Sequence, residues 1–226
     1  MFIDMHLHEK TFSEDSHVSL QEIVEEAKAK GLDAVCITDH DSMGLQAYAE
    51  QFSAETGFPI FVGAEVLTVH GDMTVFGVEA LPDMQLAAQE LIDYAAARGG
   101  ACIAAHPFRD NGRGIGHLLY TLKGLHGLES LNGNTKDGHN ALAHQTALAL
   151  KVPQFGASDA HHKNEVGRYA TYFPTEKMET VQELVFWIAS GESKPALHTD
   201  KGYTLFQPMG QRSYEKPAVA SAITTL

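Results

Sequence analysis

Two histidines stand one residue apart near the start of the chain, in the segment MFIDMHLH. Side chains two positions apart on a β-strand point to the same face, so His6 and His8 are expected side by side at the end of an apolar strand. Paired imidazoles suit divalent zinc, manganese or iron. The spacing therefore predicts part of a metal site, whose other ligands must come from elsewhere in the chain.

Further histidines and carboxylates follow other apolar runs of the sequence. His40 comes after AVCITD and His106 ends GACIAAH, while Asp159 and His161 have the spacing that gives a shared face. A single histidine at a strand end is more often an ordinary core or surface residue. Potential metal ligands at five strand ends are much less likely to occur by chance. The candidate metal ligands are His6, His8, Asp15, His40, Glu65, His106, Asp159 and His161.

The number of these ligands predicts more than one ion. Three carboxylates and five histidines exceed what one ion takes, which is about four to six ligands. Two or three divalent ions are expected, and a carboxylate such as Glu65 could bridge two of them. No CxxC pair is present, and imidazole and carboxylate without thiolate favour manganese, iron or zinc.

The elements that must position these residues alternate along the chain, which predicts an α/β fold with mostly parallel strands. Function then collects at the C-terminal ends of the strands. Seven strands could close into a distorted barrel or stay an open sheet. The expected strands are 2–8, 34–39, 59–66, 72–78, 100–106, 127–132 and 153–159. The expected helices are 19–31, 44–56, 83–98, 140–150 and 180–191.

Periodicity fades near the C-terminal end of the sequence. We expect one domain over residues 1–192 and a C-terminal extension over 193–226, in which 207–226 form a loosely held tail. The net charge of −13 argues against long nucleic acid and anionic membranes as partners, although a bound metal could still attract a small phosphorylated ligand. The oligomeric state does not follow from the sequence.

The sequence also indicates the cellular location of the protein and the redox state of its two cysteines. No apolar run is long enough to span a bilayer, and Asp4 stands where a signal peptide would carry positive charge, so a cytoplasmic protein is expected. Cys36 and Cys102 lie inside apolar runs and are expected to be reduced core residues.

The other histidines lack this strand-end placement. We expect His162 to point away from its neighbour His161, and His17 and His70 stay undecided. Surface positions are expected for His117, His126, His139, His144 and His198.

Five short motifs, taken in order, resemble the PHP (polymerase and histidinol phosphatase) family. They are His6-x-His8, Thr38-Asp39-His40, Gly63-Ala64-Glu65, Ala105-His106-Pro107 and Ser158-Asp159-Ala160-His161. The segment Val166-Gly167-Arg168-Tyr169 is similar to the small single-domain metal-dependent phosphoesterases of that family. The resemblance implies a distorted (β/α)7 barrel of TIM-like type and the hydrolysis of phosphate esters.

The resemblance also implies roles for single residues. His6, His8, Glu65 and Asp159 would hold one ion, Glu65 and His106 a second, and Asp15, His40 and His161 a third. A hydroxide bridging ions held by Glu65 and Asp159 would attack phosphorus. Family members with three ions commonly have a further histidine near the fourth strand, which this chain lacks. His70, Asp72 or Glu79 could take that place, but none matches cleanly.

Phosphate binding and the substrate are less defined. Arg109 and Arg168 could bind phosphate through two parallel hydrogen bonds, and they could equally be solvated loop arginines. The run Asn111–Gly116 could be a lid, a phosphate-binding backbone or an ordinary loop. The expected activity is hydrolysis of a small phosphate monoester, such as a metabolite or nucleotide. The alternatives are an amidohydrolase-like C–N hydrolase and an inactive metal-dependent binding module.

Overall fold

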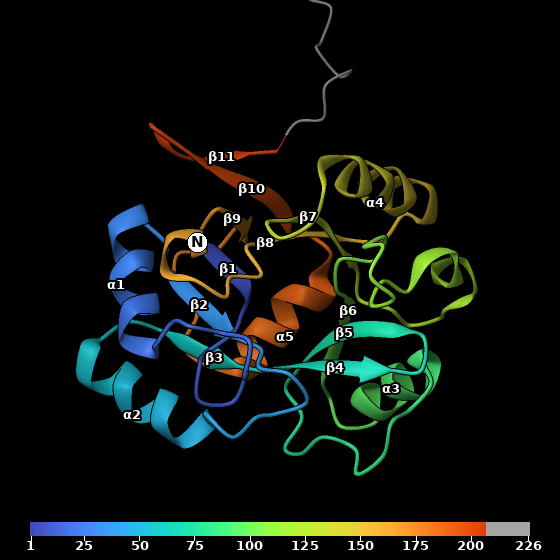
Figure 1. The fold of residues 1–226 in the computed structure, drawn as a ribbon, viewed down its shortest axis with the longest axis horizontal. Helices are drawn as coiled ribbons and strands as arrows, with labels where there is room; N and C mark the ends of the chain where they lie inside the picture. Colours follow the sequence, from blue (N-terminus) through green and yellow to red (C-terminus); the bar gives the residue numbers. More distant parts are fainter. Residues whose placement is uncertain (207–226) are drawn as a thin grey trace, which may run out of the picture.

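The computed structural model describes residues 1–206, which form a mixed α/β fold built on two β-sheets (Figure 1). The six-stranded sheet has the order β11-β10-β9-β1-β2-β3, and the five-stranded sheet has the order β4-β5-β6-β7-β8. The first sheet contains β1 (Phe2–Leu7), β2 (Ala34–Ile37), β3 (Ile60–Val62), β9 (Tyr169–Tyr172), β10 (Lys194–Thr199) and β11 (Gly202–Leu205). The second contains β4 (Ala64–Thr68), β5 (Gly71–Phe76), β6 (Ala101–Ala104), β7 (Leu128–Asn132) and β8 (Gln154–Ala157).

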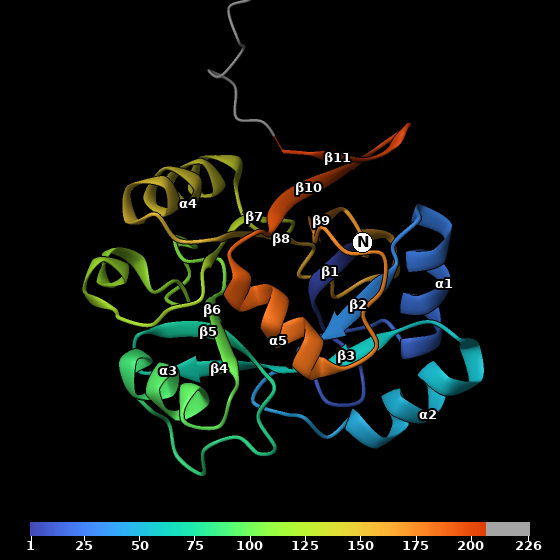
Figure 2. The same ribbon diagram turned by 180° about the vertical axis from the view of Figure 1, so that it is seen from behind.

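The described residues form five α-helices, of which the first four lie at the periphery of the sheets and the fifth crosses the centre of the front and back views (Figures 1 and 2). They are α1 (Leu20–Lys30), α2 (Gln46–Thr56), α3 (Ala88–Ala96), α4 (Asp137–Leu150) and α5 (Val181–Ser190), with 3-10 turns at Gly116–Thr121 and Lys163–Glu165. All five were predicted. The capping box of Ser19 and Glu22 opens α1, and Gly31 ends it with φ 78°. Helix α3 begins later than expected, because Glu90 accepts a hydrogen bond from the backbone N of Ala87 at 2.8 Å and so sets the first turn.

The expected barrel is not confirmed, because the two sheets do not close into one. The predicted strand 59–66 divides at Gly63 into β3 and β4, which belong to different sheets. A Cβ at Gly63 would lie 2.4 Å from the carbonyl oxygen of Val75, so the close approach of β5 requires glycine there. Strand β5 runs antiparallel to both neighbours. The strands are therefore not mostly parallel, as four adjacent pairs are parallel and five antiparallel.

The C-terminal part of the described chain extends the first sheet. Strands β9, β10 and β11 pair antiparallel beyond β1 and were not predicted. They are short, and the sequence of Lys194–Thr199 shows no clear alternation of apolar and polar residues. The predicted tail at 207–226 lies outside the described residues, and the division at residue 192 stays a prediction.

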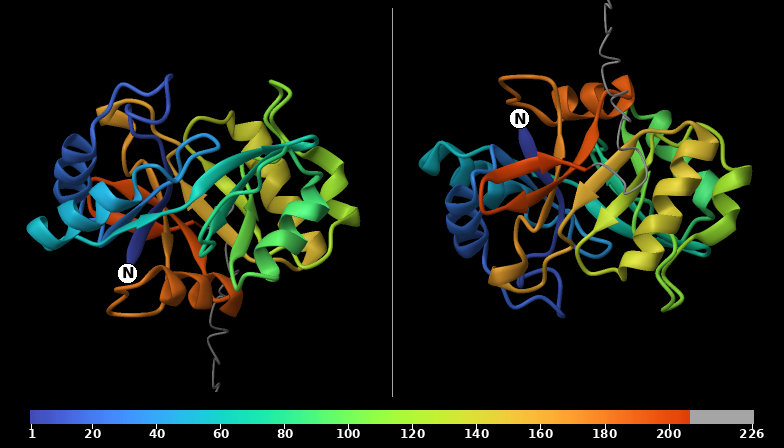
Figure 3. Two further views of the ribbon diagram at one scale, coloured as in Figure 1. Left: turned by 90° about the horizontal axis from the view of Figure 1, so that it is seen from below. Right: turned by 90° about the horizontal axis from the view of Figure 1, so that it is seen from above.

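The core consists of three buried clusters. One lies between the two sheets, where Met5 of β1 and Phe155 of β8 pack with Leu184 and Ile188 of α5. In the views from below and above, α5 lies across one end of the strands (Figure 3). Cys36 and Cys102 are free thiols in the core with 0% exposure, as predicted. Within residues 1–206, no helix is long and apolar enough to cross a membrane.

Candidate metal centre

The eight predicted ligands converge at one end of the two sheets. His6 and His8 come from the end of β1, His40 follows β2, Glu65 lies in β4, His106 follows β6, and Asp159 and His161 follow β8. Isolated bridges pair Leu7 with Ala160 and His40 with Glu65, and these bring the two sheets together at this end. Four groups of three side chains each have ligand atoms within 4.8 Å of one another: His8-His40-His161, His6-His106-Asp159, His6-His8-Glu65 and Glu65-Asp72-His106.

His6 and His8, at the end of β1, point to the same side, as expected for side chains two positions apart on a strand. Both face the carboxylates of Glu65 and Asp159. The Nε2 atoms of His6 and His8 lie 3.0 Å apart. Each Nε2 lies 3.6 Å from Oε2 of Glu65. Oδ1 of Asp159 lies 3.6 Å from Nε2 of His6 and 3.3 Å from that of His8. Four ligand atoms therefore point toward a common space.

Glu65 lies at the centre of the cluster and faces both of its sides. Its Oε1 lies 2.7 Å from Nε2 of His106, and its Oε2 lies 2.8 Å from Nδ1 of His40. The same carboxylate is in two of the four groups, with His6 and His8 and with His106 and Asp72. This placement is what a carboxylate bridging two ions needs.

Asp72 lies at the site. The sequence offered three residues in place of the absent histidine, namely His70, Asp72 and Glu79. Its Oδ2 lies 3.7 Å from Nε2 of His106, and the side chain is 1% exposed. The other two candidates lie elsewhere. His70 is exposed and accepts a hydrogen bond from the N of Ala88 at 3.2 Å, and Glu79 is exposed. Of the three candidates, Asp72 is thus the one that lies beside His106 and Glu65.

Asp15 lies at the mouth of the site. Its Oδ2 is 3.2 Å from Nε2 of His40 and 3.4 Å from Nε2 of His161. Its side chain is 59% exposed, whereas those of His40 and His161 are 28% and 14% exposed. Asp15 thus faces the two histidines predicted to share an ion with it, although it is in none of the four compact groups.

The backbone is strained at two of the ligands. The described residues include four non-glycine residues with positive φ, and two of these are His106 at 26° and Asp159 at 53°. Such conformations cost roughly 1–3 kcal/mol each and persist where surrounding contacts enforce them. Here the N of His106 donates to Glu129 at 2.9 Å and the N of Asp159 donates to the carbonyl of His6 at 2.8 Å.

Charge is concentrated in the buried part of the centre. Burial raises the pKa of Glu65, but the charge of His6 and hydrogen bonds from His106 and His40 hold that pKa well below its usual value. Burial lowers the pKa of His6, but Glu129, Asp159 and Glu65 together raise it well above its usual value. In the metal-free protein, a protonated His6 therefore supplies the countercharge to these carboxylates.

The other shifted groups show how crowded the centre is. Burial, assisted by the charge of Glu65, raises the pKa of Asp72 to about 6. Burial lowers the pKa of His8 to about 4, so this imidazole is neutral near pH 7 and has a lone pair to offer.

The donor set fits divalent metal ions. Oδ1 of Asp72 and Nδ1 of His106 are buried and have no hydrogen-bond partner among the described residues. Buried polar atoms normally find a partner, so these two unpaired atoms at a cluster of candidate ligands are consistent with a site for a cation. Nitrogen and oxygen donors without thiolate suit manganese, iron or zinc, and the identity and number of the ions stay a prediction. The metal-binding role of each single residue stays a prediction.

The centre opens into a pocket of about 520 Å³. Its lining residues are Asp15, His40, Glu65, Asp72, Arg109, Asn111, Arg113, Asn134, Asp159 and His161. The run Asn111–Gly116 therefore contributes Asn111 and Arg113 to the rim of the pocket. Nε of Arg113 donates to Oδ2 of Asp72 at 2.5 Å.

The two arginines predicted to bind phosphate differ in position. Arg109 lines the pocket, where its guanidinium contacts Oδ2 of Asp159 and Oδ1 of Asn132. Arg168 is exposed, is absent from the described lining of the pocket, and donates from Nη1 to the carbonyl of Gly133 at 3.1 Å.

Several residues at the centre were not found from the sequence. Glu129 accepts a hydrogen bond from Nδ1 of His6 at 2.8 Å, and Ser13 lies 3.2 Å from Nδ1 of His8. Asn132 donates to Glu129 at 2.8 Å. Glu129 had a usable signal, since it is a lone charge inside the apolar run GLESLN. Asn132 and Ser13 had none, because single uncharged polar residues at loop boundaries are common.

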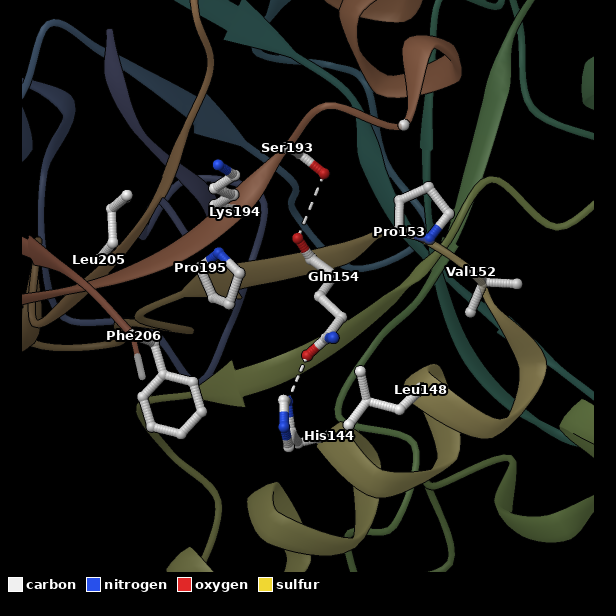
Figure 4. A pocket seen from close by; sticks show the side chains of 11 residues that line it. His144, Leu148, Val152, Pro153, Gln154, Ser193, Lys194, Pro195, Leu205 and Phe206 are labelled. Atoms are coloured by element: carbon white, nitrogen blue, oxygen red, sulfur yellow. Dashed lines mark hydrogen bonds between the residues drawn. The ribbon is translucent and has the colours of Figure 1, made fainter. Parts of the chain in front are cut away.

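The remaining histidines join none of the four metal-capable groups of the described chain. His17 and His162 stack at the surface with ring centroids 4.9 Å apart. His144 lines a different pocket, of about 430 Å³, at the start of β8, where its Nδ1 lies 2.6 Å from Oε1 of Gln154 (Figure 4). Because Gln154 and Asp159 flank opposite ends of β8, this pocket is separate from the candidate metal centre.

Comparisons with known proteins concern the family and the fold of this chain. A family model for the PHP domain matches residues 4–150, and a model for a PHP-associated segment matches residues 137–193. An uncharacterized protein of Methanocaldococcus jannaschii is 29% identical over 148 residues, which cover 61% of this chain and 85% of that protein.

Two solved structures are similar in fold. A two-domain protein of Bacteroides vulgatus, described as containing a predicted PHP-like metal-dependent phosphoesterase, has a TM-score of 0.70 and 20% identity over 88% of this chain and 65% of its own. An amidohydrolase of Chromobacterium violaceum, solved with bound sulfate and no metal, has a TM-score of 0.59 and 18% identity over 73% of this chain and 89% of its own. The family model covers more than half of the sequence, and the chain belongs to the PHP family.

Proposed function

We propose that this protein is a cytoplasmic metal-dependent phosphoesterase that hydrolyses a small phosphate monoester. The observation that supports this most is the position of Glu65, whose two carboxylate oxygens face His106 on one side and His40, His6 and His8 on the other. A carboxylate placed this way can join two ions, which is the arrangement that phosphoester hydrolysis commonly uses.

The ligands divide into three sets in this proposal. His6, His8, Glu65 and Asp159 would hold one ion, and Asp15, His40 and His161 would hold another. Glu65 and His106 would hold the third, with Asp72 in place of a further histidine. The compact groups overlap with these sets without matching them one to one, since His8 also lies close to His40 and His161. Bound manganese, iron or zinc would neutralise the phosphate and lower the pKa of a water molecule toward neutrality.

The chain's own residues bind and orient the substrate. Arg113, whose side chain is 33% exposed, and Arg109, whose side chain is 16% exposed, both line the pocket and can donate to phosphate oxygens. A pocket of about 520 Å³ suits a small molecule. The net charge of −13 disfavours a long polyanion, so a phosphorylated metabolite or nucleotide is the proposed substrate class.

A panel of phosphate monoesters tests this proposal. Protein stripped with chelator and reloaded separately with manganese, iron and zinc should release phosphate from at least one monoester, and renewed chelation should abolish the release. The matched control is Glu65→Gln, which keeps the size of the side chain but removes the charge between the sets of ligands. Failure of every reloaded form on every monoester would exclude the activity.

Likeness to an amidohydrolase favours one second candidate, hydrolysis of a C–N bond. At 18% identity this likeness concerns the fold alone. Amides, lactams and lactones belong in the same assay with the same metal-loaded protein. Cleavage of an amide with no release of phosphate would replace the first proposal by the second, and no turnover of any kind would leave a metal-dependent binding module.

A further inference from the structure

Asn132 lies beneath the candidate metal centre and joins two of its carboxylates. It ends β7 and is 0% exposed. Its Nδ2 donates to Oε2 of Glu129 at 2.8 Å and to Oδ2 of Asp159 at 3.2 Å. A primary amide offers two N–H donors, so both are used. The two carboxylates are thus held at a fixed separation by one neutral group.

The other end of the amide fixes its orientation. Oδ1 of Asn132 accepts hydrogen bonds from Nη2 of Arg109 at 2.8 Å, Oγ1 of Thr135 at 2.9 Å and the N of Asn134 at 3.0 Å. A flipped amide would place its oxygen against two carboxylates and its N–H groups against the guanidinium and the backbone N–H. Only one orientation satisfies every partner.

The first carboxylate, Glu129, determines which nitrogen of His6 is available. Oε1 of Glu129 accepts from Nδ1 of His6 at 2.8 Å, while its Oε2 accepts from Asn132 and from the N of His106 at 2.9 Å. With the hydrogen held at Nδ1, Nε2 of His6 is the nitrogen that can bind an ion. That atom faces Glu65 and Asp159.

The two oxygens of the second carboxylate, Asp159, have different partners. Its Oδ1 faces Nε2 of His6 and of His8, at 3.6 and 3.3 Å. Its Oδ2 is occupied by Nδ2 of Asn132 and by the guanidinium of Arg109. One oxygen is therefore directed to the ligands and the other to the supporting hydrogen bonds.

The backbone of Asn132 is held as firmly as its side chain. Its N donates to Oδ1 of Asn140 at 3.0 Å, and its carbonyl accepts from Nδ2 of Asn140 at 3.0 Å. Asn140 lies in α4 and is 5% exposed. This pair attaches the end of β7 to a helix, so the amide cannot shift without disturbing packed secondary structure.

From these contacts we propose that Asn132 is a positioning residue, which aims His6 and Asp159 at the metal through Glu129 and through Oδ2 of Asp159. It does not contact the substrate or the metal. The inference rests on the metal centre proposed above but not on its reaction. Arg109 shares this task through its contacts with Asp159 and Asn132, in addition to any contact with phosphate.

The test compares two Asn→Asp substitutions in the full-length protein. Asn132→Asp replaces the donor to two carboxylates by a third carboxylate oxygen. Asn134→Asp adds the same charge at an exposed residue on the rim of the same pocket. Zinc affinity is measured on metal-stripped protein by competition with a chromophoric chelator, together with the denaturation midpoint of each variant.

The two substitutions are expected to act in opposite directions. Added negative charge alone attracts a cation, so Asn134→Asp should hold zinc as tightly as the native protein or more tightly. Asn132→Asp should weaken zinc binding about tenfold or more, the scale for residues that orient metal ligands. Zinc affinity in Asn132→Asp that equals or exceeds the native value overturns the proposal, as does an equal weakening in Asn134→Asp.

A neutral variant covers the case in which Asn132→Asp does not fold. Asn132→Ser removes both amide donations without adding charge, and it should also weaken zinc binding. The Nδ1 proton of His6, observed by NMR in the zinc-loaded protein, should be sharp in the native protein and broadened or lost in the variant. An unchanged proton signal and unchanged affinity in Asn132→Ser would show that Asn132 serves only the fold. Neither measurement needs a phosphate ester, so a failure of the proposed reaction stays distinguishable.

Discussion

The inner and outer halves of the candidate metal centre use the same donor chemistry under different restraint. In the inner half, the side chains of His6, Glu65, His106 and Asp159 are at most 2% exposed. In the outer half, Asp15 is 59% and His40 28% exposed. Inner ligands are held by further protein groups such as Glu129, whereas the Asp15 side chain contacts, among residues 1–206, the imidazoles of His40 and His161.

This difference in burial determines how firmly each half of the site can hold an ion. Ligands that cannot relax keep charge and lone pairs aimed before an ion arrives, which makes binding tight but disfavours the empty state. Ligands at the mouth can turn toward water, so they would hold an ion less firmly. We therefore expect inner substitutions to affect the whole centre and outer substitutions to affect one ion.

The largest effect is expected from Glu65→Gln in the inner half. The change removes a charge that faces histidines on both sides of the centre. Metal content by elemental analysis should fall by at least one ion per chain, and turnover of any accepted substrate should fall at least about 100-fold, the scale for loss of one group that stabilises transition-state charge. Exposed Glu79→Gln is the control. Native metal content in Glu65→Gln would remove the bridging role.

Metal removal should destabilise the protein because the inner carboxylates lose their cations. An ion present at about 100 times its Kd contributes about 2.7 kcal/mol. For a chain of this size that corresponds to a fall in Tm of about 5–10 °C. Calorimetry with and without chelator measures it. Equal Tm values in the two states would mean that the buried cluster is satisfied without metal.

Proton release should accompany metal binding in the inner half. The pKa of His6 is raised well above its usual value, so His6 is protonated near pH 7 in the metal-free protein and must lose this proton when an ion binds. Affinity of the inner half should therefore fall as pH decreases, by up to about tenfold per unit for one proton. In the outer half, partial burial raises the pKa of Asp15, but His40 and His161 lower it by more, so Asp15 is already ionised and releases none. Burial lowers the pKa of His40, but Glu65 raises it by more, so any proton released there comes from His40.

Calorimetric titrations in buffers of different ionisation enthalpy count these protons. The tightest metal should release about one proton per ion at pH 7. Release of no proton would show that His6 is neutral in the metal-free protein and that its neighbours do not hold a charge on it.

The smallest effect is expected from Asp15→Asn in the outer half. Because the side chain is 59% exposed, the free energy of unfolding should change by no more than about 0.5 kcal/mol. Retention of one ion should weaken about tenfold, and turnover should fall more than substrate affinity. Glu14→Gln, one residue away and exposed, is the matched control. Native metal retention and native kcat/KM in Asp15→Asn would exclude Asp15 and make His17 the next residue to test.

The ligand positions could be predicted because strand-end spacing is local. The pattern His6-x-His8 and the caps of α1 each depend on neighbours within a few residues. Asp72 could not be predicted by the same rule. Strand β5 runs antiparallel to β6, so its beginning, where Asp72 lies, meets the ends of the other strands. A search of strand C-termini points to Glu79 instead.

The division into two sheets and the supporting hydrogen bonds depend on contacts distant in sequence. The split at Gly63 follows from the approach of Val75, which no local pattern reveals. The role of Asn132 follows from Glu129, Asp159 and Arg109, of which Arg109 and Asp159 are 23 and 27 residues away. Periodicity predicts which residues are buried, but it does not predict which strands pair or which polar atoms meet.

The two buried thiols can be used to measure how each of the two separate sheets opens. Cys36 lies in β2 of the first sheet and Cys102 in β6 of the second, and both have 0% exposure. A thiol reagent can reach either one only after its own sheet opens. Mass spectrometry of the modified peptides therefore follows the opening of each sheet separately. Equal labelling rates at the two cysteines indicate one cooperative unit, and unequal rates identify the sheet that opens first.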